Sequence, residues 1–218
     1  MPSCLLPKSL IIELPVALNC LQHLSSFLFR TKQSVAVLVT ISHLEMLSPG
    51  ELRPKDTSRS NVGIVRVEKP TPELNRFFYT AVGGDWYWLE RLPWSYGDWM
   101  CYLDRAELET WIITADGVPA GYFELERQPE ASVEIVYFGL LPNFVNVGIG
   151  GWALTQAVQR AWQMNARRVW VHTCDLDHPA ALHNYLARGF TLFKTEMKEE
   201  DLPPKPIGPW PGAGKEIR

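Results

Sequence analysis

Hydrophobic and polar residues follow regular patterns from Val62 onward, and these patterns predict strands and helices in a definite order. Short runs of β-branched and aromatic residues bounded by glycine or proline predict strands. Apolar residues spaced three and four positions apart predict helices, as after Gly148, where Leu154, Ala157 and Val158 share one face. The predicted strands are 62–67, 108–114, 119–126, 132–141, 168–174 and 190–195, and the predicted helices are 71–83, 95–105, 148–165 and 179–188.

Local signals mark the ends of several of these elements. Thr71 and Pro72 are typical of the N-cap and first position of a helix, and Gly189 suits the position that follows a helix. Asp116-Gly117 between two predicted strands indicates a hairpin. We therefore expect an α/β (mixed α+β) fold. Its sheet begins as an antiparallel meander, becomes parallel through a right-handed strand-helix-strand unit in the middle, and carries helices on both faces.

The two ends of the chain differ in composition from this central region. Glu13 is the only acidic residue before Val39, and residues 48–61 are rich in serine, proline, glycine and charge. Glu13 and Pro15 interrupt the apolar core that a secretory signal needs, so we expect no signal peptide. We expect an N-terminal extension and linker at 1–61, one domain at 62–200 and a Pro/Gly-rich tail at 201–218.

Composition excludes several classes of protein. The 218 residues are 46% hydrophobic and 21% charged, with a formal net charge of -3. A slightly acidic chain has no general electrostatic attraction for nucleic acid or an anionic membrane, and no apolar run is long enough to span a bilayer. The scattered Cys4, Cys20, Cys101 and Cys174 fit a reducing compartment. We expect a cytoplasmic protein without nucleic-acid or membrane partners.

A glycine-rich turn, Asn146-Val-Gly-Ile-Gly-Gly151, lies between a predicted strand and a predicted helix. Glycines let the backbone approach a ligand closely, and the start of a helix offers unpaired N–H groups that bind phosphate. The pattern lacks the third glycine of a Rossmann fingerprint and the lysine of a P-loop. By itself such a turn is more often an ordinary strand-to-helix connection.

The order of elements together with this turn resembles the GNAT superfamily of acyl-CoA-dependent N-acetyltransferases across 62–195. The family's phosphate loop matches at Gly148 and Gly150, whereas Val145 stands where a polar or cationic residue is usual. The resemblance implies acetyl-CoA as co-substrate, no metal, and a coenzyme held by the strand end and the loop. These residues are Phe138, Gly139, Leu140, Val145, Asn146, Val147, Gly148, Ile149, Gly150 and Gly151.

A second match lies in 177–190, which is similar to the family's Asn-x-x-Ala-x-x-x-Tyr-x-x-x-Gly-Phe helix. His178 stands where asparagine is common and is expected to contact the coenzyme. The resemblance implies that Tyr185 protonates the departing CoA thiolate. Tyr185 also lies on an apolar helix face, so a purely structural role in the core is the alternative.

Transfer of an acetyl group to an amine also needs a proton acceptor, because amines are mostly protonated at neutral pH. Strict alternation places Glu134 on one strand face with Val136 and Phe138, opposite Val133 and Ile135. A carboxylate among apolar neighbours gains a raised pKa, which suits a base. Glu134 is therefore the predicted catalytic base, and an exposed carboxylate at a strand edge is the alternative.

Polar residues crowd 172–183 without the spacing of a common zinc site, so no metal is expected; they include His172, Cys174, Asp177 and His183. Asp177 or His178 is instead expected to cap the following helix.

An aromatic block precedes the meander and is expected to form the acceptor wall through Trp86, Trp88, Trp94 and Tyr96. Acidic residues near it, including Glu90, favour a positively charged acceptor. The resemblance implies direct acetyl transfer, in a ternary complex, to the primary amine of a small molecule or peptide, and leaves a homodimer open. A non-catalytic acyl-CoA-binding sensor with the same fold is the alternative, and a nucleotide-binding oxidoreductase fits the glycine pattern poorly.

Overall fold

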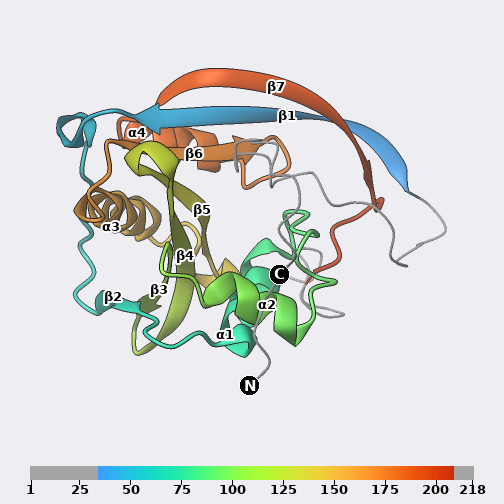
Figure 1. The fold of residues 1–218 in the computed structure, drawn as a ribbon, viewed down its shortest axis with the longest axis horizontal. Helices are drawn as coiled ribbons and strands as arrows, with labels where there is room; N and C mark the ends of the chain where they lie inside the picture. Colours follow the sequence, from blue (N-terminus) through green and yellow to red (C-terminus); the bar gives the residue numbers. More distant parts are fainter. Residues whose placement is uncertain (1–33, 209–218) are drawn as a thin grey trace.

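The computed structural model describes residues 34–208 and contains one seven-stranded sheet in the order β2-β3-β4-β5-β6-β1-β7 (Figure 1). Strands β2 to β5 form an antiparallel meander, and β5 pairs with β6 in parallel. This mixed sheet confirms the predicted fold class. The strands are β1 Val35–Met46, β2 Val62–Arg66, β3 Leu108–Ala115, β4 Val118–Gln128, β5 Ser132–Leu140, β6 Arg168–Cys174 and β7 Thr191–Leu202. The helices are α1 Pro72–Gly83, α2 Tyr96–Leu103, α3 Gly150–Gln163 and α4 Ala181–Ala187.

Helices cover both faces of the sheet, as the apolar periodicity predicts (Figure 1). On one face, Phe78 and Val82 of α1 pack against Tyr122 of β4. On the other face, Leu154 and Val158 of α3 enter the main core, which also contains α4. Fully burying one such side chain contributes about 1.5–3 kcal/mol to the free energy of folding. Packing of the helices on both faces therefore stabilises the sheet.

Strand β1 lies between β6 and β7, which corrects the predicted extension at 1–61. Ile41, for example, faces Cys174 of β6 on one side and Glu196 of β7 on the other. The run 35–39 is apolar on both faces, as expected for a strand with two neighbours, but its position next to an apolar N-terminal segment hid this signal. The domain therefore includes residues 35–46, and the prediction for 1–33 lies outside the described residues.

The C-terminal boundary of the domain also differs from the predicted one. Strand β7 is twelve residues long and runs to Leu202, whereas the sequence predicts a strand that ends at residue 195 and a tail from 201. Within 34–208, β7 pairs with β1 alone, so it joins the sheet only through that strand. The rest of the predicted tail, 209–218, is outside the described residues.

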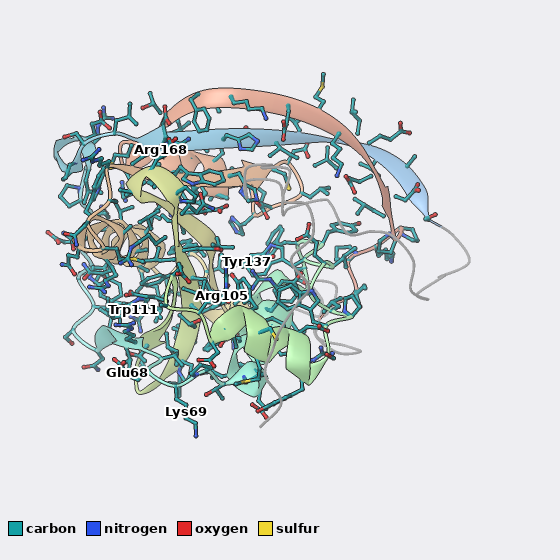
Figure 2. The ribbon with its side chains drawn as sticks, viewed as in Figure 1. Glu68, Lys69, Arg105, Trp111, Tyr137 and Arg168 are labelled. Carbon is teal, nitrogen blue, oxygen red and sulfur yellow. The ribbon has the colours of Figure 1, made fainter. Side chains whose placement is uncertain are left out.

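A β-bulge in β5 reverses the predicted alternation of its side chains. Ile135 lies opposite Leu125, but Tyr137 lies opposite Glu124, so Val136 is an extra residue. Tyr137 therefore points to the side of α1 and α2 (Figure 2). Glu134 lies on the same side, opposite Val133 and Ile135, while Phe138 packs into the α3 side. The predicted face shared by Glu134, Val136 and Phe138 is wrong for this reason.

The parallel pairing of β5 and β6 is short. It joins 132–134 to 168–170, although β5 continues to Leu140 and β6 to Cys174. Beyond residue 134 the facing edges of the two strands have no pairing with each other, so their backbone N–H and C=O groups are available to a ligand. This divergence creates the opening in which the candidate site lies.

Candidate active site

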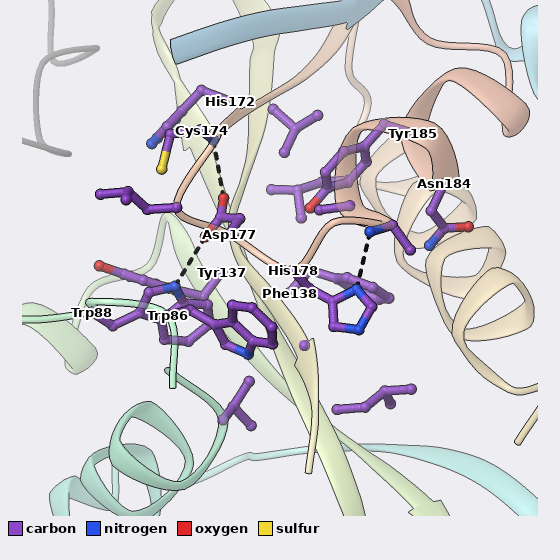
Figure 3. A pocket seen from close by; sticks show the side chains of 18 of the residues that line it. Trp86, Trp88, Tyr137, Phe138, His172, Cys174, Asp177, His178, Asn184 and Tyr185 are labelled. Atoms are coloured by element: carbon purple, nitrogen blue, oxygen red, sulfur yellow. Dashed lines mark hydrogen bonds between the residues drawn. The ribbon is translucent and has the colours of Figure 1, made fainter. Parts of the chain in front are cut away.

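A cavity of about 520 Å³ occupies the opening between β5 and β6 (Figure 3). Its wall is formed by the ends of these strands, the start of α3, helix α4, the loop 86–90 and the inner parts of β1 and β7. It thus joins the glycine-rich turn to the aromatic block, two features that are about sixty residues apart in the sequence.

One end of the cavity is the glycine-rich turn. It is lined by five of the residues that the sequence assigns to coenzyme binding, namely Val145, Asn146, Gly148, Gly150 and Gly151. The turn is shaped by Gly148, whose φ of +86° is readily adopted only by glycine. Helix α3 starts at Gly150 and has no side-chain hydrogen bond capping its N-terminus, so its first N–H groups remain available to an anion.

Two residues of the predicted coenzyme site do not line the cavity. Val147 and Ile149 alternate with the glycines and point the other way, into the core beneath α3. Ile149 has no exposed surface. Their role is to anchor the turn, which is a correction to the predicted set of ligand contacts.

Two cations that the sequence reasoning missed stand beside the turn. Arg188, which follows α4, and Lys55 both line the cavity next to Gly151. The Nε of Arg188 is buried and has no hydrogen-bond partner among the described residues, and burial lowers the pKa of its guanidinium. Arg188 and Lys55 supply the positive charge that Val145 cannot. No local sequence motif indicates either residue.

A charge introduced at Gly150 tests this end of the cavity. A Cβ at this position would meet only Leu140 Cδ1, at 3.7 Å, so a small side chain fits without disturbing the fold. We expect Gly150→Asp to weaken CoA binding at least about tenfold, because a carboxylate within about 5 Å of a phosphate is strongly repelled. Calorimetric titration with CoA measures the effect. Gly150→Ala is the matched control, and equal Kd values for the two variants would contradict a phosphate site here.

The middle of the cavity runs along the end of β5. Phe138, Gly139 and Leu140, which the sequence also assigns to coenzyme binding, line it. Helix α1 approaches so closely that a side chain at Gly139 would overlap Val82, which explains the glycine. The free edge of this strand can hydrogen-bond an extended ligand lying between β5 and β6, as an added strand would.

The β6–α4 loop forms the opposite wall. Asp177 accepts hydrogen bonds from Thr173 Oγ1 at 2.7 Å, Cys174 N at 3.1 Å and Trp88 Nε1 at 3.4 Å (Figure 3). His178 Nδ1 accepts from Ala180 N at 3.0 Å, immediately before α4. No side chain caps α4, so Asp177 does not play the predicted capping role and instead ties the loop to Trp88.

Tyr185 lies on the cavity-facing side of α4 and is 6% exposed. Burial, and to a smaller extent the negative charge of Asp177, raises the pKa of its hydroxyl. The group therefore keeps its proton at any working pH and can donate to an anion formed in the cavity. Its edge-to-face contact with Phe190 shows that it also has the core role considered as the alternative.

Glu134 is not among the residues that line the cavity. Its carboxylate is buried, accepts a hydrogen bond from Gln128 Nε2 at 2.6 Å and lies 3.2 Å from His172 Nδ1. His172 does line the cavity. The geometry therefore gives Glu134 the role of holding His172, rather than the direct contact with substrate that the sequence predicts.

Glu90 is one of three carboxylates that line the cavity, together with Asp177 and Glu200. Burial raises its pKa to about 8, an effect opposed by Arg91, His172 and Lys198 and reinforced by Glu200. Its Oε1 is buried without a hydrogen-bond partner in the described part of the chain. The sequence places Glu90 near the aromatic block, but nothing in its spacing reveals that it is desolvated.

The loop that carries Glu90 is fixed by its neighbour Arg91. The Arg91 guanidinium donates to Glu124 at 2.9 Å and lies over the rings of Tyr102 and Tyr137, at 3.9 and 4.4 Å from their centroids. Its backbone N–H donates to Tyr79 Oη at 3.1 Å. Because Arg91 is committed to this cluster, its guanidinium forms its ion pair with Glu124 and not with Glu90.

Only two of the four residues of the predicted acceptor wall line the cavity. Trp86 and Trp88 line the cavity, with Trp86 edge-to-face against His178 and Trp88 against Tyr137 (Figure 3). Trp94 instead packs against Trp99 under Arg91, and Tyr96 is 62% exposed on α2. These two predicted contacts therefore do not belong to the cavity.

The described residues contain neither a metal site nor a membrane-spanning helix. Residues 34–208 contain no group of three or more His, Cys, Asp or Glu side chains placed to hold a metal ion. In the same part of the chain, no helix combines the length and apolar character needed to cross a membrane.

A splayed mixed sheet with an uncapped helix N-terminus at one end of its cavity suits a protein that binds an anionic ligand. The model of the acetyltransferase (GNAT) family matches residues 70–190, more than half of the chain, and the chain therefore belongs to this family. No curated protein sequence matches it.

Solved structures agree with the fold. A GCN5-related N-acetyltransferase from Kribbella flavida is 21% identical with a TM-score of 0.55, over 76% of this chain and 60% of that chain. A GCN5-related N-acetyltransferase from Sphaerobacter thermophilus is 12% identical with a TM-score of 0.56, over 77% and 53% of the two chains. A putative acetyltransferase of the GNAT family from Novosphingobium aromaticivorans is 14% identical with a TM-score of 0.51, over 77% and 65%. The chain thus spans less than two thirds of these proteins, and the likeness concerns the fold.

Proposed function

We propose that this protein transfers the acetyl group of acetyl-CoA to a primary amine within a ternary complex. One observation carries the proposal: a single cavity joins an uncapped helix N-terminus flanked by two cations to Glu90, whose buried Oε1 has no hydrogen-bond partner among the described residues. The first feature suits the coenzyme phosphates and the second suits an ammonium group. The open edge of β5 between them suits the pantetheine arm.

The two ends supply a proton acceptor and a proton donor for the reaction. Glu90 accepts the first proton from the ammonium, and the freed amine attacks the thioester carbonyl carbon to give a tetrahedral intermediate. The C–S bond then breaks and the thiolate takes a proton from the Tyr185 hydroxyl. The attached nitrogen loses its second proton to solvent as the amide forms, and solvent returns a proton to Tyr185. Both groups line the cavity, and orientation of the two substrates contributes the rest of the rate.

The pKa of Glu90 favours this role. The equilibrium constant for proton transfer from an amine with a pKa near 10.4 to an ordinary glutamate is about 10⁻⁶. Because the pKa of Glu90 is about 8, the constant for transfer to Glu90 is roughly 10⁻². Glu134 and His172 act as positioning residues beside it, through their 3.2 Å contact.

Loss of the Tyr185 hydroxyl tests the proton return. We expect Tyr185→Phe to lower kcat by about tenfold to a hundredfold, at the low end of general-acid effects because a thiolate is a good leaving group. Release of CoA thiol from acetyl-CoA in the presence of an amine measures the rate, and calorimetry measures CoA affinity. Since phenylalanine keeps the ring contact with Phe190, the Kd for CoA should stay within about twofold. An unchanged kcat would assign the proton return to another group.

A second candidate function is a non-catalytic acyl-CoA-binding domain. It is favoured by Val145, which lines the phosphate end without the side-chain contact usual at that position of the loop. Tight binding of acetyl-CoA without thiol release for any amine, together with rates indifferent to changes at Glu90 and Tyr185, would support it over the enzyme.

A further inference from the structure

The cavity ends in an apolar wall that none of the sequence motifs includes. Val39 and Ile41 of β1 form a cluster with Leu202 of β7, and Tyr87 and Leu89 pack against it from the loop 86–90. All five residues line the cavity. This wall is therefore built by the strand that joins β6 to β7 and by the loop that carries the candidate base.

Beside this wall, one carboxyl oxygen lacks a hydrogen bond. Glu200 of β7 lies 2.9 Å from Lys198 Nζ, and Arg91 is paired with Glu124. The buried Oε1 of Glu90 has no hydrogen-bond partner within residues 34–208. His172, also in the wall, is held 3.2 Å from Glu134. A single cationic group placed next to Glu90 would satisfy the site, since a buried carboxylate needs a hydrogen-bonded partner.

Resting on the transferase function proposed above, we infer that the acceptor is a primary amine carried on a single apolar group, without an α-carboxylate. The ammonium lies against Glu90 and the hydrocarbon lies on Val39, Ile41 and Leu202. Hydroxyl groups on the acceptor would be desolvated against this wall without partners, which is costly. A carboxylate next to the amine would be repelled by Glu90 and Glu200.

Binding of a homologous series of amines decides this inference separately from catalysis. Propyl-, butyl-, pentyl- and hexylamine are titrated calorimetrically into the protein saturated with CoA. Each methylene that leaves water should improve Kd about fourfold, until the wall is covered. The isosteric 2-(2-aminoethoxy)ethanol should bind at least about tenfold more weakly than hexylamine, because its ether and hydroxyl oxygens lose water. Norleucine, which adds a carboxylate to pentylamine, should also bind at least about tenfold more weakly than pentylamine.

A variant within the wall provides the second arm. Leu89→Asn keeps the side-chain size in a loop that is only partly buried, and should flatten the dependence of Kd on chain length while leaving CoA affinity unchanged. Leu47→Asn, at a leucine that is 59% exposed and outside the cavity, is the matched control and should leave the dependence intact.

The outcomes separate the inference from the proposed function. Affinity that is independent of chain length, or stronger for the polar isostere or norleucine, overturns the apolar-amine site. Chain-length-dependent binding without acetylation of hexylamine supports the site and overturns the transferase function. Equal kcat/KM for all these amines supports the transferase and overturns the assignment of its acceptor.

Discussion

Replacing Leu44 by alanine is expected to lower the free energy of unfolding by about 2–5 kcal/mol, the range for truncating a fully buried leucine. Leu44 has no exposed surface and lies in the main core with Met46 and Val171. Its strand pairs on both sides, so the core around it cannot collapse easily into the space left behind. Urea denaturation followed by tryptophan fluorescence gives the difference between variant and parent.

The same strand contains a matched control. Leu38 is 61% exposed, and Leu38→Ala should change stability by less than about 0.5 kcal/mol, as surface substitutions usually do. If Leu44→Ala were equally mild, residues 35–46 would not be part of the folded sheet in solution. The comparison thus decides between the structure and the extension that composition alone suggests.

Replacing Glu90 by glutamine is expected to reduce kcat/KM for an amine by about 10²–10⁴, the range for loss of a general base. The parent enzyme should gain activity as pH rises through about 8, because Glu90 must be ionised to accept a proton. Groups facing it from its own loop and from β6 and β7 (Arg91, His172, Lys198 and Glu200) adjust this value, but burial dominates. Glu90→Gln should lose this limb of the pH profile, measured at saturating acetyl-CoA.

Two controls make the interpretation of Glu90→Gln specific. Glu134→Gln leaves a polar group beside His172 and should have the smaller effect on rate; an equal loss would return the role of base to Glu134. Stability gives the other control. The folded pKa of Glu90 lies above its unfolded value, so the folded state binds the extra proton and loses stability as pH rises from about 4.5 to 8. Glu90→Gln should therefore gain stability relative to the parent at pH 9 but not at pH 4.

The sequence was sufficient for the central part of the fold. Turn and cap signals such as Asp116-Gly117 and Thr71-Pro72 mark real boundaries, because they depend on local backbone preferences. The glycine turn was identified for the same reason. The second helix likewise begins at a true capping box between Ser95 and Asp98.

The parts that could not be predicted depend on contacts between distant residues. Strand β1 is recognisable only once β6 and β7 are present to flank it, and the extra residue Val136 appears only in register with β4. The same limit applies to the site. Whether Glu90 or Glu134 reaches the cavity depends on this bulge and on Arg91, and Arg188 and Lys55 converge only through the fold.

The position of β1 has a consequence for how the chain folds. Ile41 must wait for Cys174 and Glu196 to be synthesised before its strand has either neighbour. Closing such long loops is slow, so we expect the meander and its helices to form first and the β6-β1-β7 ribbon to dock last. Val39, Glu200 and Leu202 belong to that ribbon, and their end of the cavity is therefore expected to be the last part of the site to assemble.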